Sequence, residues 1–250
     1  IGTAPHYLRR PVAPLSSRPA TMNIHPRRFI RPALGTLCLA TLATLQACNG
    51  DACFGVDACF NNNTQTVALS GTAATGGALA SAQVTVSCVA GSATTLTDGG
   101  GNYRLTVNAA LPCVITVTSG GTSLHSLAYA GGTFNTTPET ELMLVYLAAQ
   151  LGTNTGTLIG NFQGNSRYQQ AMNNADTVQA AQSAVVTNLQ QRYSVALTAP
   201  AFLTTSFTVG QPGVDSDLAA LAKAGAIDSN GMPDPAAVSL LTQAGAAHPL

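Results

Sequence analysis

Residues 97–108 read TDGGGNYRLTVN, and this stretch decides the fold class of the region around it. Asp98 to Asn102 is a turn cluster, because its three glycines permit positive φ angles. After the turn, apolar and polar residues alternate with the period of two that is typical of a half-buried β-strand. The apolar residues are Tyr103, Leu105 and Val107, and the polar ones are Arg104, Thr106 and Asn108. The stretch therefore predicts a turn that leads into a strand.

Two further segments show the same alternation. The residues that share one face are Val84, Val86 and Cys88 in the first segment, and Cys113, Ile115 and Val117 in the second. Glycine-rich turns such as Gly76-Gly77 separate the short segments, which is typical of an antiparallel sandwich. We therefore expect residues 66–136 to form an antiparallel β-sandwich.

The same region resembles the carboxypeptidase regulatory-like, or transthyretin-like, module. Three segments carry the resemblance: Val67-Ala-Leu-Ser-Gly71, Leu79-Ala-Ser-Ala-Gln-Val-Thr-Val86 and Thr97-Asp-Gly-Gly-Gly-Asn-Tyr103. The resemblance covers residues 66–136 and implies an Ig-like, transthyretin-like sandwich. An additional glycine in the last segment and the pair of cysteines depart from the common pattern of the module. Such modules are usually non-catalytic spacers or binding units, and a fold by itself does not determine an activity.

The following residues, 137–250, have a helical pattern. Thr137 is a candidate N-cap, Pro138 suits the first helical position, and Glu139 lies near the positive end of the helix dipole. Apolar residues then recur at helical spacing as far as Gly152. Further helices are expected over about 176–193, 215–224 and 235–245, whereas residues 153–166 are expected to be a loop. The predicted fold class is therefore α+β, a β-sandwich followed by an α-helical C-terminal region.

The composition excludes several classes of protein. Hydrophobic residues make up 46% and charged residues 8% of the chain, whereas about 25% of the residues in an average globular protein are charged. A disordered chain needs the opposite balance. Ten Lys and Arg residues are too few for the extended basic surface that binds nucleic acid, so we expect no nucleic-acid partner. No run of 18 apolar residues is present, so we expect no ordinary transmembrane helix.

The charges are distributed unevenly along the chain. Six of the ten Lys and Arg residues lie before residue 32, and all ten Asp and Glu residues lie after residue 50. Three arginines follow Met22 and precede the uncharged, apolar stretch 33–45. As a helix, that stretch would span about 20 Å, which is too short for a bilayer core of about 30 Å but typical of a signal peptide. We therefore expect residues 22–47 to be a signal peptide and residues 1–21 to be an extension upstream of the natural start.

Leu45-Gln46-Ala47-Cys48 closes this stretch and resembles the lipobox of bacterial lipoproteins. The resemblance implies that a diacylglyceryl group is attached to the thiol of Cys48 and that a peptidase cleaves before Cys48. Such an anchor holds a protein firmly at a membrane, since each buried CH₂ group contributes about 0.8 kcal/mol. Gln46 is a less usual residue at its position, and ordinary signal cleavage with Cys48 as a plain thiol is the alternative. Residues 48–65 are rich in Asn, Asp and Gly and are expected to form a flexible tether.

If Cys48 is lipidated and Cys38 is removed with the signal peptide, four cysteines remain: Cys53, Cys59, Cys88 and Cys113. An even number in an exported chain suggests two disulfides, for which three connectivities are possible. We favour Cys53–Cys59 because the two residues are close in sequence. We favour Cys88–Cys113 because both residues face inward from their strands, so that a bridge across the core is geometrically reasonable. A metal site at Cys53 and Cys59 is the alternative, although no His lies near and the spacing is not that of a zinc site.

Sequence features of catalysis are scarce. After signal cleavage, the remaining histidines are His125, in an expected strand, and His248, near the end of the sequence. No G-x-S-x-G nucleophile motif accompanies His125. Glu139 and Glu141 are two positions apart on a helix and therefore face different ways, and Asp228 lies in a turn that lacks the distal Glu of an EF-hand. We expect no catalytic residue, no metal ligand and no cofactor.

The sequence predicts the location of the protein in more detail than its activity. The leading hypothesis is a non-catalytic, lipid-anchored protein of the cell envelope that contacts the membrane through Cys48. Such a protein would bind an envelope protein or a glycan, or would support surface structure. Asn49, directly after the lipidated cysteine, favours the outer membrane over the inner one. The alternative is an envelope hydrolase or an enzyme accessory factor, which would use His125 beside an acidic residue in a deep, polar cleft.

Overall fold

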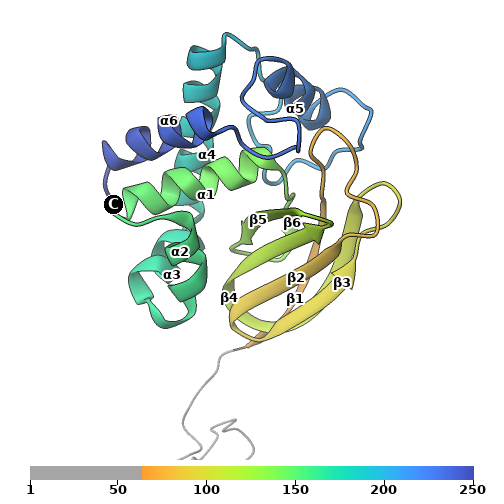
Figure 1. Cartoon of the computed structure of the whole chain (residues 1–250). Coiled ribbons are helices and arrows are strands. Elements are labelled where there is room, and N and C mark those ends of the chain that lie inside the picture. The colour runs from red at the N-terminus through yellow and green to blue at the C-terminus, as the bar shows by residue number, and fades with distance from the viewer. Residues whose placement is uncertain (1–63) are drawn as a thin grey trace, which may run out of the picture. The chain divides into compact units, whose positions relative to one another are not determined.

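The sheet is organised around one long strand. The computed structural model describes residues 64–250, and in it β4 (Asn102–Ser119) pairs with three other strands along its length. Its first half pairs antiparallel with β1 (Gln65–Thr72). Its second half pairs antiparallel with β2 (Gln83–Ala90) on one side and with β5 (Thr122–Ala128) on the other. β4 therefore joins two sets of strands, as Figure 1 shows.

Two shorter strands complete the sheet. β3 (Ser92–Leu96) pairs antiparallel with β2, and β6 (Gly132–Thr133) pairs parallel with β1. The strand order is β3-β2-β4-β1-β6, with β5 attached to β4. The sheet is thus six-stranded and mixed, so the expectation of purely antiparallel pairing is wrong at β6. A strand of two residues has no alternation from which its pairing could be predicted.

The turn and strand predicted from residues 97–108 are present. Tyr103 and Val107 are buried on the inner side of β4, whereas the polar residues between and after them are exposed. In the turn, the Asp98 carboxylate accepts hydrogen bonds from the backbone N–H groups of Gly100 and Asn102, both at 2.8 Å. Gly101 has a φ of +80°, and a Cβ atom there would lie 2.4 Å from the carbonyl oxygen of Ala73. Only glycine fits this position without a rearrangement.

Four of the helices lie close to their expected bounds. They are α1 (Pro138–Gln150), α4 (Ala175–Tyr193), α5 (Val214–Lys223) and α6 (Pro235–Ala246). α1 begins as its sequence predicts, with Thr137 as the N-cap and Pro138 in the first turn.

The expected loop over residues 153–166 is wrong. It contains α2 (Thr155–Asn161) and the 3₁₀ helix η1 (Phe162–Gly164), and α3 (Ser166–Asn173) begins at its end. Asn side chains cap two of these short helices: Asn154 Oδ1 accepts the N–H of Thr157, and Asn165 Oδ1 accepts the N–H of Arg167 and of Tyr168. Leu158 and Phe162 anchor the segment in the core. Asn and Gly favour caps as well as loops, so composition alone did not separate the two.

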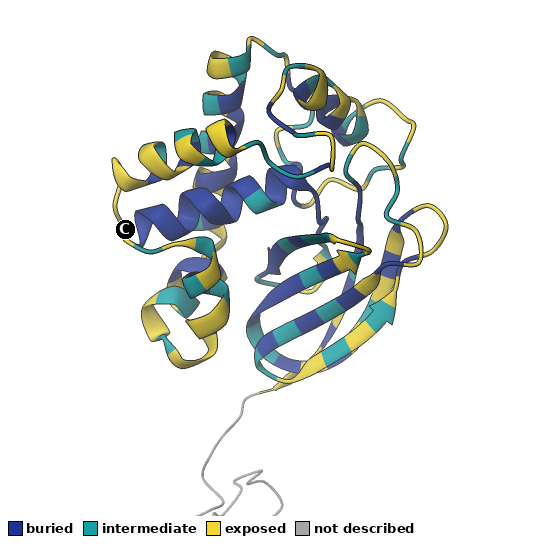
Figure 2. Ribbon diagram, viewed as in Figure 1, coloured by how far each residue is buried: buried dark blue, intermediate teal, exposed yellow. Residues whose placement is uncertain are grey.

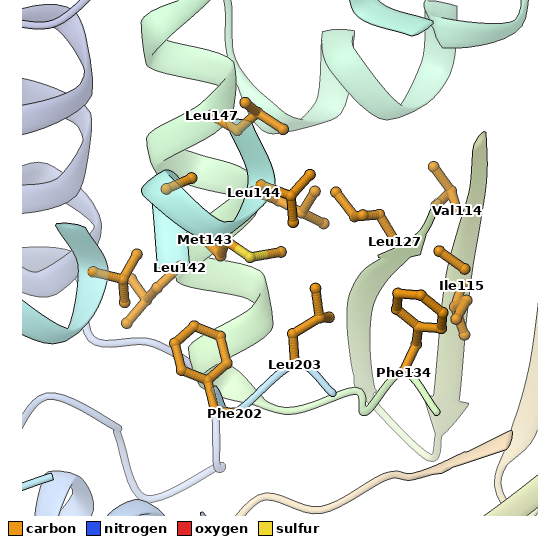
Figure 3. Close-up of a cluster of buried hydrophobic side chains, with 14 of the residues drawn as sticks. Val114, Ile115, Leu127, Phe134, Leu142, Met143, Leu144, Leu147, Phe202 and Leu203 are labelled. Carbon is orange, nitrogen blue, oxygen red and sulfur yellow. The ribbon is translucent and has the colours of Figure 1, made fainter. Parts of the chain in front are cut away.

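α1 is the central helix of the molecule. Every residue in it is buried except Glu141, and its ribbon is mostly dark blue in Figure 2. It packs against β5 of the sheet and against the helices α4 and α6. Figure 3 shows Leu144 of α1 and Leu127 of β5 pointing toward each other. A single buried cluster includes residues of the sheet and of the helices, and the described residues belong to one compact unit.

Several sequence-based expectations concern residues 1–63, which lie outside the described part of the chain. They are the upstream extension, the signal peptide, the tether as far as residue 63, the lipidation at Cys48 and the Cys53–Cys59 bridge. The predicted tether ends one residue too late, because Gln65 already belongs to β1. Among the helices of residues 64–250, none by itself has the length and hydropathy to cross a bilayer. The segments Pro138–Gln150 and Thr155–Gly164 reach those values only together, as a pair bent by 85°.

Candidate functional site

Cys88 and Cys113 form a disulfide, as the sequence predicts. The two residues occupy the same register position on β2 and β4, and both are fully buried. The bridge therefore joins two neighbouring strands rather than crossing the core between layers. Next to the bridge, the pairing of β2 shifts by a bulge between Cys88 and Ala90. The disulfide fixes this register and offers no exposed thiol for chemistry.

His125 is hydrogen-bonded to an acidic residue. Its Nδ1 atom lies 2.9 Å from Oε2 of Glu141, and its backbone N–H donates to the same oxygen at 2.7 Å. The hydroxyl of Thr140 donates to the carbonyl of His125 at 2.9 Å. These bonds fasten β5 to the first turn of α1. None of the clefts described below includes His125 or Glu141 in its lining.

Glu139 lies in a different environment from Glu141, as expected for residues two positions apart. Its side chain is 1% exposed, and its Oε2 atom has no hydrogen-bond partner among the described residues. Burial, and secondarily the negative charge of Asp217, raise the pKa of Glu139 well above its usual value. Asp217 is also buried, but the backbone N–H groups of Thr198 and Ala199 donate to its carboxylate. The structure thus brings together Asp217, whose carboxylate has several hydrogen-bond donors, and Glu139, whose Oε2 atom has none among residues 64–250.

Two neighbouring clefts along β1, which together we name the groove, combine polar side chains with one arginine and one aspartate. The first part of the groove, which we name the polar cleft, has a volume of about 380 Å³ and is lined by Ser70, Thr72, Asn102, Arg104, Thr133 and Phe207 among others. Its second part, the edge cleft, has a volume of about 540 Å³ and is lined by residues 65–70, Arg104, Gly131 and Gly132. The two clefts share Ser70 and Arg104 and are therefore neighbours.

The alternation of the strands places the polar side chains of the groove. Ser70 pairs with Arg104, and Thr72 pairs with Asn102, in the register of β1 and β4. Paired residues of two neighbouring strands point to the same face of a sheet. Because Leu69 of β1 and Tyr103 of β4 point into the core, the residues next to them point outward.

One wall of the polar cleft, which we name the polar wall, is held together by hydrogen bonds between its own side chains. Its residues are Ser70, Thr72, Asn102 and Thr133. The hydroxyl of Thr72 lies 3.0 Å from Oδ1 of Asn102 and 3.2 Å from the carbonyl oxygen of Phe207, and these two acceptors share its single hydrogen. The hydroxyls of Ser70 and Thr133 are 3.3 Å apart. These bonds fix the side chains before any ligand arrives, which lowers the entropic cost of binding.

Asn135 brings a distant loop to this wall. It is fully buried, and its side-chain N–H groups donate to the carbonyls of Phe202 and Thr205 at 2.8 and 2.7 Å. Its Oδ1 atom accepts the N–H of Thr72 at 3.1 Å. The loop that carries Phe207 is thereby attached to β1 and forms one side of the polar cleft.

Arg104 is the cation of the groove. It is exposed, and within residues 64–250 it makes no ion pair. Asp98 also lines the polar cleft, but its carboxylate accepts hydrogen bonds from residues of its own turn. These bonds, chiefly the one from the Asn102 side chain, lower the pKa of Asp98. Arg104 is therefore available to an anionic ligand.

Other residues that the sequence singled out have local roles. Asp228 Oδ1 accepts the backbone N–H groups of Asn230 and Met232, at 2.8 and 2.9 Å, so Asp228 stabilises a turn. The carbonyl of His248 accepts a hydrogen bond from the Gln150 side chain at 2.9 Å. In the part of the chain that the structure describes, no three His, Cys, Asp or Glu side chains converge as metal ligands.

The groove was not predicted from the sequence. Its residues come from four separated segments, around 70, 104, 132 and 207, which only the fold brings together. One signal was present, because Arg104 is the sole Lys or Arg between residues 32 and 166. An isolated cation in a β-region whose one acid is Asp98 is the kind of residue that indicates a binding site.

Comparison of the chain with models of protein families, with curated proteins and with solved structures finds no match to any of them.

Proposed function

We propose that this protein is a non-catalytic binding module of the cell envelope, and that a lipid on Cys48 anchors it to the outer membrane. The groove along β1 is its binding site. The observation that carries the binding role is the pair of adjacent clefts that share Ser70 and Arg104, a cation with no ion pair within residues 64–250. The location rests on the sequence: the arginines and apolar stretch that precede Cys48, the lipobox-like segment 45–48, and Asn49.

We further propose that the sheet region is a transthyretin-like sandwich. Support comes from the placement of the three segments that carry the resemblance. The first lies in β1, the second runs into β2, and the third is the turn that leads into β4. The shared strand β4, which pairs with β1 in its first half and with β2 and β5 in its second, provides two sets of strands that enclose buried apolar residues.

Cross-linking in cells tests the binding role. A photo-reactive amino acid is introduced in place of Thr66, which is exposed and lines the edge cleft, or in place of Gln179, which is exposed on α4. We expect a discrete cross-linked product from the Thr66 position and none from the Gln179 position. The substitution Arg104→Gln should reduce the Thr66 product. Equal products from both positions, or a Thr66 product that does not depend on Arg104, would contradict a binding site in the groove.

An envelope hydrolase is the second candidate, and the hydrogen bond between His125 and Glu141 is the observation that favours it. An acid that orients a histidine is one part of a hydrolytic site, and Thr116, opposite His125 in the register of β4 and β5, provides a hydroxyl. Labelling of the full chain by a fluorophosphonate, abolished by His125→Gln, would support this candidate. Unlabelled protein would leave the binding module as the better account.

A further inference from the structure

We propose that the polar cleft binds a glycan that carries a carboxylate, such as an oligosaccharide that contains uronic acid, and that Arg104 pairs with this carboxylate. The inference rests on the proposed function, because it names the class of partner for the same groove. Its basis is the juxtaposition of one unpaired cation, a wall of hydroxyl and amide groups and one aromatic ring in a single cleft.

The charge of the ligand follows from Arg104. Its guanidinium has no ionic partner within residues 64–250, and it is the only charged residue that lines the edge cleft. In the polar cleft the one acid, Asp98, is ionised, and hydrogen bonds from Gly100 and Asn102 hold its carboxylate in its own turn. A guanidinium with free N–H groups binds a carboxylate through two parallel hydrogen bonds. A carboxylate on a ligand in the groove therefore has Arg104 as its ionic partner.

The hydroxyl groups of a sugar match the remaining wall. Ser70 and Thr133 provide hydroxyls, which both donate and accept, and Asn102 provides an amide, whereas Thr72 is buried and supports Asn102. These side chains are already positioned by the bonds between Thr72 and Asn102 and between Ser70 and Thr133. The side chain of Phe207 adds an apolar surface at the same cleft. Ligand sites commonly combine apolar or aromatic surface with a few fixed polar groups of this kind.

An extended peptide fits the polar cleft less well. A peptide that adds to a sheet edge needs free backbone N–H and C=O groups on that edge. Beside the polar cleft these groups of β1 are occupied: the carbonyl of Ser70 accepts from Phe134, the N–H of Thr72 donates to Asn135, and the carbonyl of Thr72 accepts from Thr136. A ligand in this cleft meets side chains, which is how oligosaccharides are recognised.

Titration calorimetry of the full chain with trigalacturonate tests the proposal. The uncharged comparison is a trisaccharide of galactose with the same linkage. The variant is Arg104→Gln, and its matched control is Arg192→Gln, which removes an exposed arginine from the last turn of α4. We expect trigalacturonate to bind the wild type, Arg104→Gln to weaken binding at least tenfold, and Arg192→Gln to leave it unchanged. The uncharged trisaccharide should bind at least tenfold more weakly than the charged one.

Four results would overturn the proposal: no binding of trigalacturonate at millimolar concentration, equal binding of the two sugars, unchanged binding by Arg104→Gln, or Arg104-dependent binding of an acidic peptide instead. The cross-linking at Thr66 separates this failure from failure of the proposed function. An Arg104-dependent product at Thr66 without uronate binding would reject the glycan and retain the binding module. The absence of both would reject both.

Discussion

Cys88 of β2 and Cys113 of β4 face each other in register and are joined by a disulfide, with 25 residues of sequence separation between them. The bridge closes the loop that contains β3 and the first part of β4. In the unfolded chain such a cross-link removes conformational freedom, and the loss is larger for a longer loop. The disulfide is therefore expected to stabilise the sheet chiefly through the unfolded state.

The double variant Cys88→Ala/Cys113→Ala should lower the free energy of unfolding by about 3 kcal/mol, as loop-closure entropy predicts for a loop of this size. Urea denaturation of the wild type and of the variant measures the difference. A reducing agent should destabilise the wild type and leave the variant unchanged. Peptide mapping of exported protein without reduction provides an independent check, and free thiols at both positions would reject the bridge.

Glu139 should make stability depend on pH. Its pKa is raised in the folded state above the usual value of 4.5, first by burial and then by Asp217. Below about pH 4.5 the folded and unfolded states are both protonated at this site, and the stabilising effect of the neutral form is fully present. As the pH rises from there to the folded-state pKa, the unfolded state loses its proton first and stability falls, by about 1.4 kcal/mol for each pH unit of that interval.

The substitution Glu139→Gln keeps the shape of the protonated acid but cannot ionise. We expect it to remove this fall, so that the variant gains stability relative to the wild type as the pH rises from 4.5 to 8. Urea denaturation across that range measures the gain. Gln179→Ala, an exposed substitution on α4 that changes no ionisable group, is the control and should show no such trend. A constant difference between Glu139→Gln and wild type would show that Glu139 ionises alike in both states.

The two residues that connect β5 to α1, His125 and Glu141, should contribute unequally to the free energy of unfolding. Glu141 accepts hydrogen bonds from both the ring and the backbone N–H of His125. Glu141→Ala leaves that partly buried N–H without its partner, which costs about 1–3 kcal/mol. His125→Ala removes only the ring bond and should cost less. Chemical denaturation of the two single variants and the double variant measures the order and the coupling, and a larger loss in His125→Ala would contradict the observed bonding.

Gly245 allows α6 to approach α1 closely. A Cβ atom at Gly245 would lie 2.4 Å from the carbonyl oxygen of Tyr146 and 2.9 Å from Cβ of Ala149. Gly245→Ala should therefore displace α6 and destabilise the protein by about 1–3 kcal/mol. Gly160→Ala, in α2, is the matched control, since its Cβ would meet open space and alanine favours a helix by about 1 kcal/mol. The thermal unfolding temperature should fall for Gly245→Ala, and it should rise or stay unchanged for Gly160→Ala.

The features that the sequence predicts well are those with a local physical cause. The alternation after Asn102 predicts the buried and exposed sides of β4, and Thr137-Pro138 predicts the start of α1. The inward positions of Cys88 and Cys113 predict that they can meet. In each case the signal lies within a few residues of the element it describes.

The features that the sequence does not predict depend on contacts between distant segments. β6 exists because it pairs with β1, and its two residues carry no pattern of their own. α2 depends on one Asn cap and one buried leucine, Leu158, in a stretch whose composition resembles a loop. The polar cleft forms because Asn135 holds the loop of Phe207 against β1. The burial of Glu139 likewise requires the tertiary fold.

Metabolic labelling of cells with a palmitate analogue tests the central proposal, a binding module attached to the envelope by a lipid, most directly. The wild-type chain is compared with Cys48→Ala and with Cys53→Ala as a control for the loss of a different thiol in the same region. We predict that the wild type and Cys53→Ala carry the label and that Cys48→Ala does not. Equal labelling of all three chains, or no label on the wild type, would contradict the lipid anchor at Cys48.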